Sequence, residues 1–346
     1  MPKVQTGAII GLMSAITISI RPESECDHLR PFNAMRDLRA VVELVELCFY
    51  GGTDKGGRRS RSMHGMDRAG RFLRWSPPIL QAMSFPHLGY VWEEDGRIVG
   101  NVSLVPFRRR GERVYLIANV AVHPDYRRRG IARALMTRAL RHARRRKANS
   151  IWLHVRTENA TAIRLYRDLG FVPRAERTTW EASATPALGG YRGAFRLVHN
   201  AKRWWGRQRH WLKIAYPPEL AWYYRFPNWH ALRPDLWGGL YRLVMGYHVQ
   251  RWVAVQAGQP LGVLARVSWG ERVDVLWAAL APKADPSALT ALLIQARSHA
   301  PPRHILWLDY PTGEADSAIR AAGFNPQRTL LWMRAEGTSA TSGATK

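Results

Sequence analysis

The sequence predicts an α/β (α+β) fold, a mixed twisted sheet flanked by helices, and it predicts that this unit occurs twice. Three observations support this. Strand-like and helix-like apolar patterns alternate along the first half of the chain. A turn rich in arginine and glycine joins a strand to a helix in "VAVHPDYRRRGIARAL", residues 120–135. Several sequence features then recur in the same order in the second half.

The elements of the first half follow closely on one another. Apolar residues at helical spacing predict a helix over 35–49, and Asp95-Gly96 predicts the turn of a hairpin over 89–107. Gly170 is a natural end for a short helix over 159–171. The remaining predicted elements are strands over 16–22, 113–122, 150–156 and 174–182, a helix over 130–147, and a basic loop over 51–72.

The second half resembles the first. "GYVWEEDGRIVGNVSL" (89–104) is similar to "RWVAVQAGQPLGVLAR" (251–266), and Gly-Glu-Arg-Val occurs at 111–114 and at 270–273. The further matches pair 120–124 with 278–282, 150–155 with 304–310, and 165–171 with 318–324. A duplication explains this shared order. The alternative is two unrelated α/β domains that share common strand composition.

These features divide the chain into five segments. We expect a flexible leader (1–13), a first domain (14–185), a linker with the start of the second domain (186–250), a second domain (195–336) and a disordered tail (337–346). The stretch 183–250 is dense in Trp, Tyr and Pro, which predicts packed irregular structure.

Composition narrows the classes of ligand and partner. Lys and Arg number 52 and Asp and Glu 26, so the formal net charge is +26, which favours anionic ligands, acidic partners or nucleic acid. Two cysteines are too few for a disulfide framework and favour a cytoplasmic protein. Neither C-x-x-C nor H-E-x-x-H occurs, so no metal is expected. The apolar stretch 7–20 is too short to span a bilayer, so no membrane partner is expected. The oligomeric state stays open.

The turn at 127–132 has the properties of an anion site. A helix start offers unpaired backbone N–H groups and a positive dipole end. Gly130 has no Cβ to obstruct a ligand, and Ala132 has only a methyl group. The turn therefore predicts a phosphate-bearing ligand, unless it is a buried strand–helix connection with a basic turn and no ligand.

Together with "WLHVRTENATAIRLYRDLGF" (152–171), this motif resembles the GCN5-related N-acetyltransferases (GNAT), and within them the pattern of the ribosomal-protein alanine N-acetyltransferases. The resemblance covers residues 16–182 well and 195–335 weakly. It implies a tandem GNAT fold and acetyl-CoA as cosubstrate. The second copy is degenerate, because "APKADPSALT" (281–290) replaces "HPDYRRRGIA" (123–132) and lacks its glycine.

The resemblance also implies the cofactor-binding residues. In the family, the strand at Val120, Ala121 and Val122 separates from its neighbour and pairs its backbone with the pantetheine amides. The backbone of the following turn surrounds the pyrophosphate, and its residues here are Arg127, Arg128, Arg129, Gly130, Ile131 and Ala132. Asn159 resembles the family asparagine that bonds the cofactor arm, although an asparagine there is also a favoured helix N-cap.

Two residues are catalytic candidates. Tyr166 can protonate the departing CoA thiolate as a general acid, or it is a core tyrosine at helical spacing. His154 stands in "LHVR" where related enzymes often have glutamate, so it can act as general base, or it only fills a strand position. Glu158, His123 and Glu93 are weaker candidates for the base.

The predicted function is transfer of an acetyl group from acetyl-CoA to a primary amine by direct attack in a ternary complex. An α-amine has a pKa of about 7.7–8 and a lysine amine about 10.4, so a site without an obvious carboxylate base suits an N-terminal α-amine or another amine of low pKa, protein, peptide or small molecule. The alternatives are an acyl-CoA-binding sensor and a basic nucleic-acid-binding protein using 57–62 and 138–147. No recognised nucleic-acid motif accompanies those runs, so no specific nucleic-acid partner is expected.

Overall fold

The computed structural model describes residues 28–50, 88–109, 111–186, 190–199, 201–220, 223, 229–268 and 272–337. The predicted leader, the strand at 16–22, the loop at 51–72 and the tail beyond Gly337 lie outside these residues. Within the described residues, no helix is both long enough and apolar enough to cross a bilayer.

The first half contains the predicted elements between residues 28 and 183. The helices and strands are β1 (Leu29–Pro31), α1 (Ala34–Tyr50), β2 (Gly89–Glu94), β3 (Arg97–Arg109), β4 (Glu112–Val122), the 3-10 turn η2 (Pro124–Tyr126), α4 (Ile131–Arg145), β5 (Ser150–Arg156), α5 (Ala160–Asp168) and β6 (Val172–Ser183). Asp95 and Gly96 have φ of 49° and 75°, as the predicted hairpin turn requires.

The second half repeats this order. It contains β7 (Arg196–His199), η4 (Lys202–Trp204), α6 (Trp205–Ala215), α7 (Trp229–Leu232), α8 (Leu236–Met245), β8 (His248–Gln256), β9 (Gln259–Ser268), β10 (Val273–Leu280), α9 (Ser287–Ser298), β11 (Ile305–Pro311), α10 (Asp316–Ala321) and β12 (Asn325–Glu336). The series β8 to β12, with α9 and α10, matches β2 to β6, with α4 and α5. The predicted tandem α/β fold is therefore confirmed. The prediction of irregular structure over 183–250 was wrong for much of that stretch, because it contains the strand β7 and the helices α6, α7 and α8.

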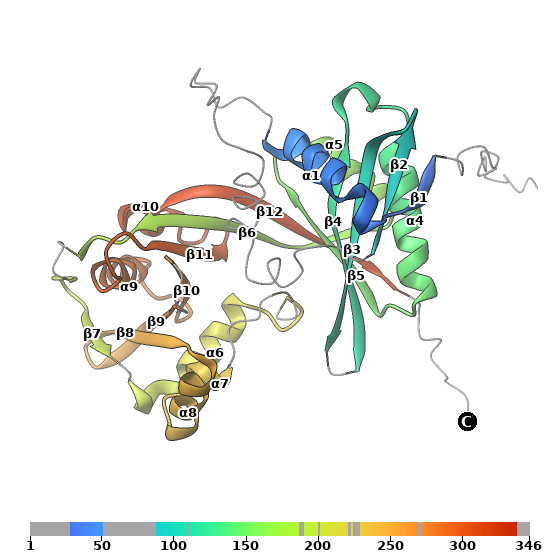
Figure 1. Cartoon of the computed structure of the whole chain (residues 1–346). Coiled ribbons are helices and arrows are strands. Elements are labelled where there is room, and N and C mark those ends of the chain that lie inside the picture. Colours follow the sequence, from blue (N-terminus) through green and yellow to red (C-terminus); the bar gives the residue numbers. More distant parts are fainter. Residues whose placement is uncertain are drawn as a thin grey trace, which may run out of the picture.

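The strands of the described residues form one twelve-stranded mixed sheet, in the order β1-β2-β3-β4-β5-β12-β6-β11-β10-β9-β8-β7. The last strand of each half pairs with the other half, since β12 lies beside β5 and β6 lies beside β11. Figure 1 shows β6 and β12 running together between the halves. Thr178 and Thr329 face each other at the centre of this pair, with their hydroxyl oxygens 2.9 Å apart. The sheet thus continues across the predicted domain boundary. The division into domains at 14–185 and 195–336 stays a prediction from the sequence.

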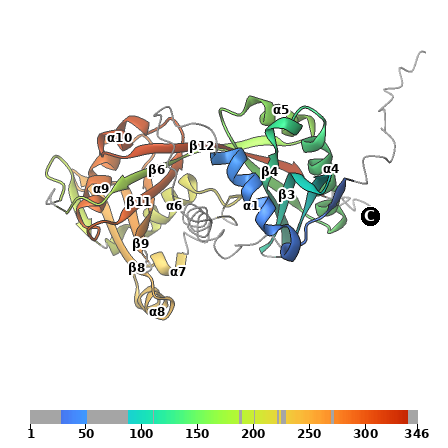
Figure 2. The same ribbon diagram turned by 45° about the horizontal axis from the view of Figure 1, so that its top comes forward.

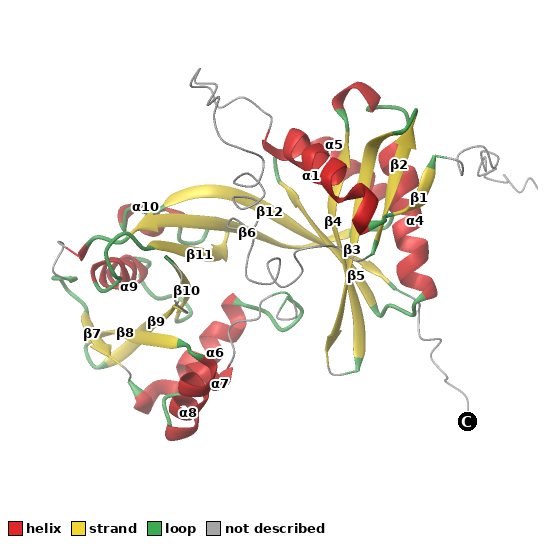
Figure 3. Ribbon diagram, viewed as in Figure 1, coloured by secondary structure: helices red, strands yellow, loops and turns green. Residues whose placement is uncertain are grey.

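Helices cover both faces of the sheet (Figures 2 and 3). In the first half, α4 buries Ile131, Leu135 and Met136 against one face, together with Tyr166 of α5. Two hydrophobic clusters cover the opposite face. Helix α1 packs in one of them, and Leu220 and Tyr223 of the second half pack in the other. Strands β4 and β5 lie between these two layers.

Candidate active site

Strands β4 and β5 separate part-way along their length. Their parallel pairing covers only Val114 to Leu116 against Ser150 to Trp152. Beyond these pairs β4 continues to Val122 and β5 to Arg156. The predicted backbone-pairing residues Val120, Ala121 and Val122 lie in this unpaired part of β4. Their edge toward β5 can accept an extended ligand that bears amide groups, as an added strand would.

A β-bulge marks the start of the gap. Asn101 of β3 pairs with Ala121 and Ser103 pairs with Ala118, so Asn119 and Val120 stand opposite a single residue. Asn119 has φ of 51°, a left-handed value that asparagine tolerates better than most residues. The buried Asn101 side chain donates to the Asn119 carbonyl oxygen at 2.8 Å and holds the bulge.

The turn after β4 enters α4 through a left-handed glycine. Gly130 has φ of 84° and precedes α4 without a side-chain cap. The first N–H groups of α4 therefore have no intrahelical or capping partner. Ile131 is buried in the core, so only its backbone can face a ligand, whereas Ala132 is partly exposed.

The three arginines of the turn, Arg127, Arg128 and Arg129, are exposed. Arg127 Nε donates to the Val122 carbonyl oxygen at 3.2 Å. Arg129 lies 3.6 Å from a Glu94 carboxylate oxygen and stacks over the Tyr126 ring. Their charge favours an anion near the turn, and the backbone N–H groups offer it the directional contacts.

Asn159 is the N-cap of α5. Its side-chain oxygen accepts from the Ala162 backbone N–H at 3.1 Å. The residue is exposed, so its side-chain NH₂ group can still reach a ligand.

Tyr166 is 7% exposed and lies in the same core cluster as Val120 of β4 and Val155 of β5, the two borders of the gap. Burial raises the pKa of the Tyr166 phenol to about 12, so the hydroxyl keeps its proton at neutral pH. The residue can therefore act as a hydrogen-bond donor at the gap.

His154 lies on the opposite face of the sheet. Alternation along β5 puts it on the side of Trp152, and it stands directly opposite Trp332 of β12. Its ring is 5.0 Å from the Trp332 ring and 5.9 Å from the Tyr223 ring. Burial, with a smaller contribution from the Arg328 charge, lowers the pKa of His154 to about 4. His154 is therefore neutral at pH 7 but a weak base.

The gap consequently separates Tyr166 on one face from His154 on the other. A ligand between β4 and β5 would therefore have the phenol on the α4 side and the imidazole on the α1 side.

The sequence profile of the acetyltransferase (GNAT) family matches residues 42–171, which contain the gap, the Gly130 turn and Tyr166. This part of the chain belongs to the GNAT family. The match agrees with the resemblance inferred from the motifs.

Individual relatives cover less of the chain. The [ribosomal protein bS18]-alanine N-acetyltransferase of Escherichia coli K12 is 47% identical over 53 residues, which are 15% of this chain and 36% of that enzyme. The N-alpha-acetyltransferase RimI of Mycobacterium tuberculosis is 33% identical over 99 residues, 28% of this chain and 61% of that protein. A GCN5-related N-acetyltransferase from Sphaerobacter thermophilus has a similar fold, with a TM-score of 0.54 at 14% identity over 92% of this chain and 99% of that chain.

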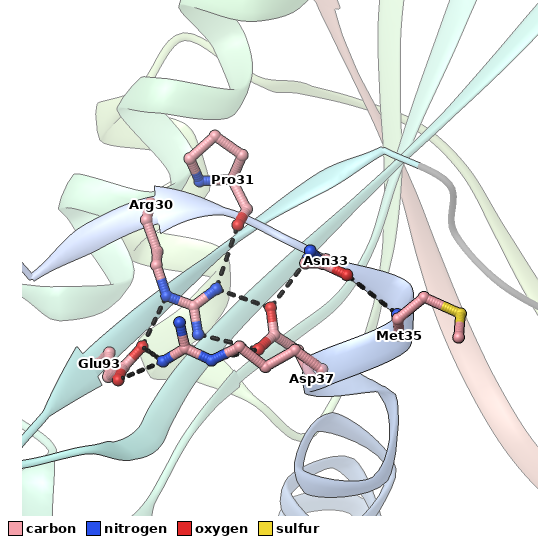
Figure 4. Close-up of polar contacts among 7 residues, drawn as sticks. Arg30, Pro31, Asn33, Met35, Asp37 and Glu93 are labelled. Carbon is pink, nitrogen blue, oxygen red and sulfur yellow. Dashed lines mark hydrogen bonds and ion pairs between the residues drawn. The ribbon is translucent and has the colours of Figure 1, made fainter.

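Of the other residues considered as bases, His123 directly follows β4, and Glu93 is held in ion pairs beside α1. Glu93 accepts from Arg30 and Arg36, and Arg30 also binds Asp37 at the start of α1 (Figure 4). Glu158 is exposed at the end of β5. Among the described residues, no group of three or more His, Cys, Asp or Glu side chains could hold a metal ion.

The second GNAT-like unit has a closed gap. Strands β10 and β11 pair from Val273 to Leu276 against Ile305 to Leu308 and then separate, without a bulge. The buried Tyr216 side chain fills the opening: its hydroxyl donates to the Asp309 carbonyl oxygen at 3.0 Å and accepts from the Ala278 N–H at 3.4 Å. By register, Asp309 corresponds to His154, and Arg177 binds its carboxylate.

Sequence reasoning missed the bulge and the residues that the second half contributes. A signal for the bulge was present. The distance from the Gly-Glu-Arg-Val valine to the start of the next matched segment is six residues in the first copy (114 to 120) and five in the second (273 to 278). Nothing in the sequence placed Tyr223 or Trp332 beside His154.

Proposed function

We propose that this protein is an acetyl-CoA-dependent N-acetyltransferase whose first half binds the donor and whose acceptor is an N-terminal α-amine or a small-molecule primary amine. The observation that carries the proposal is the gap between β4 and β5, which opens at the Asn119 bulge and leads to the Gly130 turn. An open strand edge followed by an open helix N-terminus suits a ligand with amides at one end and a pyrophosphate at the other.

The residues present fit this donor. Val120, Ala121 and Val122 offer backbone N–H and C=O groups to the pantetheine arm, and residues 127–132 offer N–H groups to the pyrophosphate. Asn159 can donate its side-chain NH₂ to the same arm. The bound donor supplies an acetyl group activated as a thioester.

The amine nitrogen attacks the carbonyl carbon, so that a C–N bond forms and the C–S bond breaks. The nitrogen loses one proton to solvent, and the CoA thiolate takes one up from solvent after the C–S bond has broken, so the protons balance. Tyr166 donates a hydrogen bond to the departing sulfur. Because its pKa is about 12 and that of a thiol about 8.5, it stabilises the thiolate chiefly by this bond rather than by complete proton transfer.

The acceptor lies on the His154 side of the gap. A base with a pKa of about 4 cannot efficiently deprotonate a lysine amine near 10.4, whereas roughly a tenth or more of an α-amine is already neutral at pH 7. His154 therefore serves as a neutral hydrogen-bond acceptor for an amine of low pKa.

The second half completes the acceptor side. Tyr223 is 4% exposed and its ring lies 4.6 Å from that of Trp332, beside His154. Leu330 of β12 stands opposite Arg156 of β5. Arg328 lies two residues before Leu330, so it is on the same face of β12 as Leu330 and Trp332. We propose that this half selects the acceptor and does not bind a second donor.

The test measures release of free CoA. The full chain is incubated with acetyl-CoA and a panel of peptides with different N-termini, acetylated control peptides with an internal lysine, and small amines. We expect release with free α-amines or with one class of small amine, and none with blocked peptides that offer only lysine. Tight CoA binding without release in any mixture would favour the acyl-CoA sensor. Failure to bind CoA would overturn the proposal.

A further inference from the structure

Helix α8 turns its apolar side outward. Leu236, Trp237, Leu240, Leu243 and Val244 follow the spacing of a single helix face, i, i+1, i+4, i+7 and i+8. They are 92%, 72%, 52%, 79% and 74% exposed. A surface helix of a globular protein normally buries such a stripe against the core.

The helix is nevertheless firmly attached by its opposite side. Arg242 donates to the carbonyl oxygens of Ala231 and Arg233 at 2.9 and 2.8 Å. Asp235 caps the first turn by accepting from the Gly238 N–H at 2.8 Å. Tyr241 packs against the core cluster of the second half. The orientation of the apolar stripe is therefore fixed by specific contacts on its polar side.

The surroundings of α8 are basic. Residues 201–247 contain eight Lys or Arg residues and only two acidic ones, Glu219 and Asp235. Five of the basic residues are exposed on η4 and α6: Lys202, Arg203, Arg207, Arg209 and Lys213. Helix α6 and Tyr241 of α8 share one core cluster, and Figures 1 and 3 show α6, α7 and α8 grouped at one end of the second half.

We propose that α8 docks on the surface of an anionic lipid bilayer. The stripe would enter the boundary between head groups and acyl chains, where tryptophan is favoured, while the basic residues of η4 and α6 meet anionic head groups. A second copy of the chain is a poorer occupant, because it would bring two strongly basic surfaces together. Surface docking needs no spanning helix, so it is compatible with the short apolar stretches in the sequence.

The test is sedimentation of the full chain with vesicles of phosphatidylcholine alone or with about one third phosphatidylglycerol. We expect capture by the anionic vesicles that weakens with salt. The double variant Trp237→Ser/Leu243→Ser should lower the partition coefficient at least about tenfold. The control Met35→Ser/Val172→Ser changes two residues that are 96% and 54% exposed outside α8, and should bind as wild type.

Three outcomes would overturn the proposal. Equal binding by the α8 variant and the control would show attraction by charge alone. Absence of binding to either kind of vesicle would exclude a lipid surface. A wild-type dimer that the α8 variant converts to a monomer in light scattering, without vesicle binding, would assign the stripe to a second copy. Equal melting temperatures of the variants establish that the fold is retained.

Discussion

The Tyr216 hydroxyl donates to the carbonyl oxygen of Asp309 at 3.0 Å, across the gap between the parallel strands of the second half. Tyr216 comes from the end of α6 and is 2% exposed. In the first half, β4 and β5 pair only from Val114 to Leu116 against Ser150 to Trp152 and then separate at the Asn119 bulge. The same fold thus occurs once with an open gap and once with a closed one.

This difference predicts one CoA site per chain. Titration calorimetry with CoA should give a stoichiometry near one for the wild type. Tyr216→Phe keeps the ring in place and removes both hydroxyl contacts, so it should lower the free energy of unfolding by about 1–3 kcal/mol and leave the stoichiometry unchanged. Two sites in the wild type would contradict closure of the second gap.

Gly130→Ala should weaken CoA binding more than it destabilises the fold. No atom lies within 4 Å of the added Cβ, so the folding cost is the left-handed conformation, about 1–2 kcal/mol. The Cβ would stand at the N-terminus of α4, where the pyrophosphate is expected. We predict an increase of at least about tenfold in the Kd for CoA.

Gly96→Ala is the matched control for this prediction. Gly96 has φ of 75° and also has no atom within 4 Å of an added Cβ, but it lies in the β2–β3 turn. It should lower the melting temperature similarly and leave CoA affinity unchanged. Equal effects of both variants on affinity would remove the turn at Gly130 from the site.

Asp37 should contribute strongly to stability. It is 1% exposed and accepts from Arg30 at 2.6 and 2.8 Å and from the Asn33 N–H at 2.8 Å (Figure 4). Asp37→Asn should cost about 3 kcal/mol, because it removes a buried charge that pairs with Arg30 and leaves that partly buried arginine with Glu93 as a charged partner. Glu43→Gln on the same helix removes a surface pair and should cost under about 0.5 kcal/mol in the same denaturant titration.

Asp37 also predicts acid sensitivity. The hydrogen bond from Arg30 holds its pKa below the ordinary value of 3.8. The stabilisation is therefore complete above that value and is lost as the pH falls through the lower folded-state pKa. Asp37→Asn should unfold with a weaker dependence on pH below 4 than the wild type.

His154 affects stability over a different pH range. Its pKa falls from an ordinary 6.5 to about 4 in the folded chain. Between pH 6.5 and 4, His154 is protonated in the unfolded chain and neutral in the folded chain. The free energy of unfolding therefore decreases as the pH falls toward 4. Between pH 7 and 4 the wild type should lose about 2–3 kcal/mol more than His154→Gln. His248→Gln, at an exposed histidine, is the control, and identical pH profiles of all three proteins would contradict the burial of His154.

Local features of the first half were predictable because they depend on nearby residues. Spacing of apolar side chains placed α4 and β5, and Asp95-Gly96 and Gly170 placed a turn and a helix end. The exchange of β6 and β12 depends on pairing between strands far apart in sequence, to which no local pattern points. For the same reason the enclosure of His154 by Tyr223 and Trp332 could not be predicted.

The catalytic prediction with the sharpest test concerns Tyr166. Tyr166→Phe removes only the hydroxyl, so the core cluster around α5 should keep its packing, and the melting temperature and the Kd for CoA should stay near wild type. If the hydroxyl stabilises the departing sulfur, kcat should fall about 10²-fold or more with little change in the KM of the acceptor. Tyr310→Phe is the matched control, because burial also raises the pKa of Tyr310 to about 12 but the residue lies in the second half. A Tyr166→Phe enzyme with wild-type kcat would assign the residue to the core alone, and an equal fall in the Tyr310→Phe enzyme would trace the loss to a general effect of removing a buried hydroxyl.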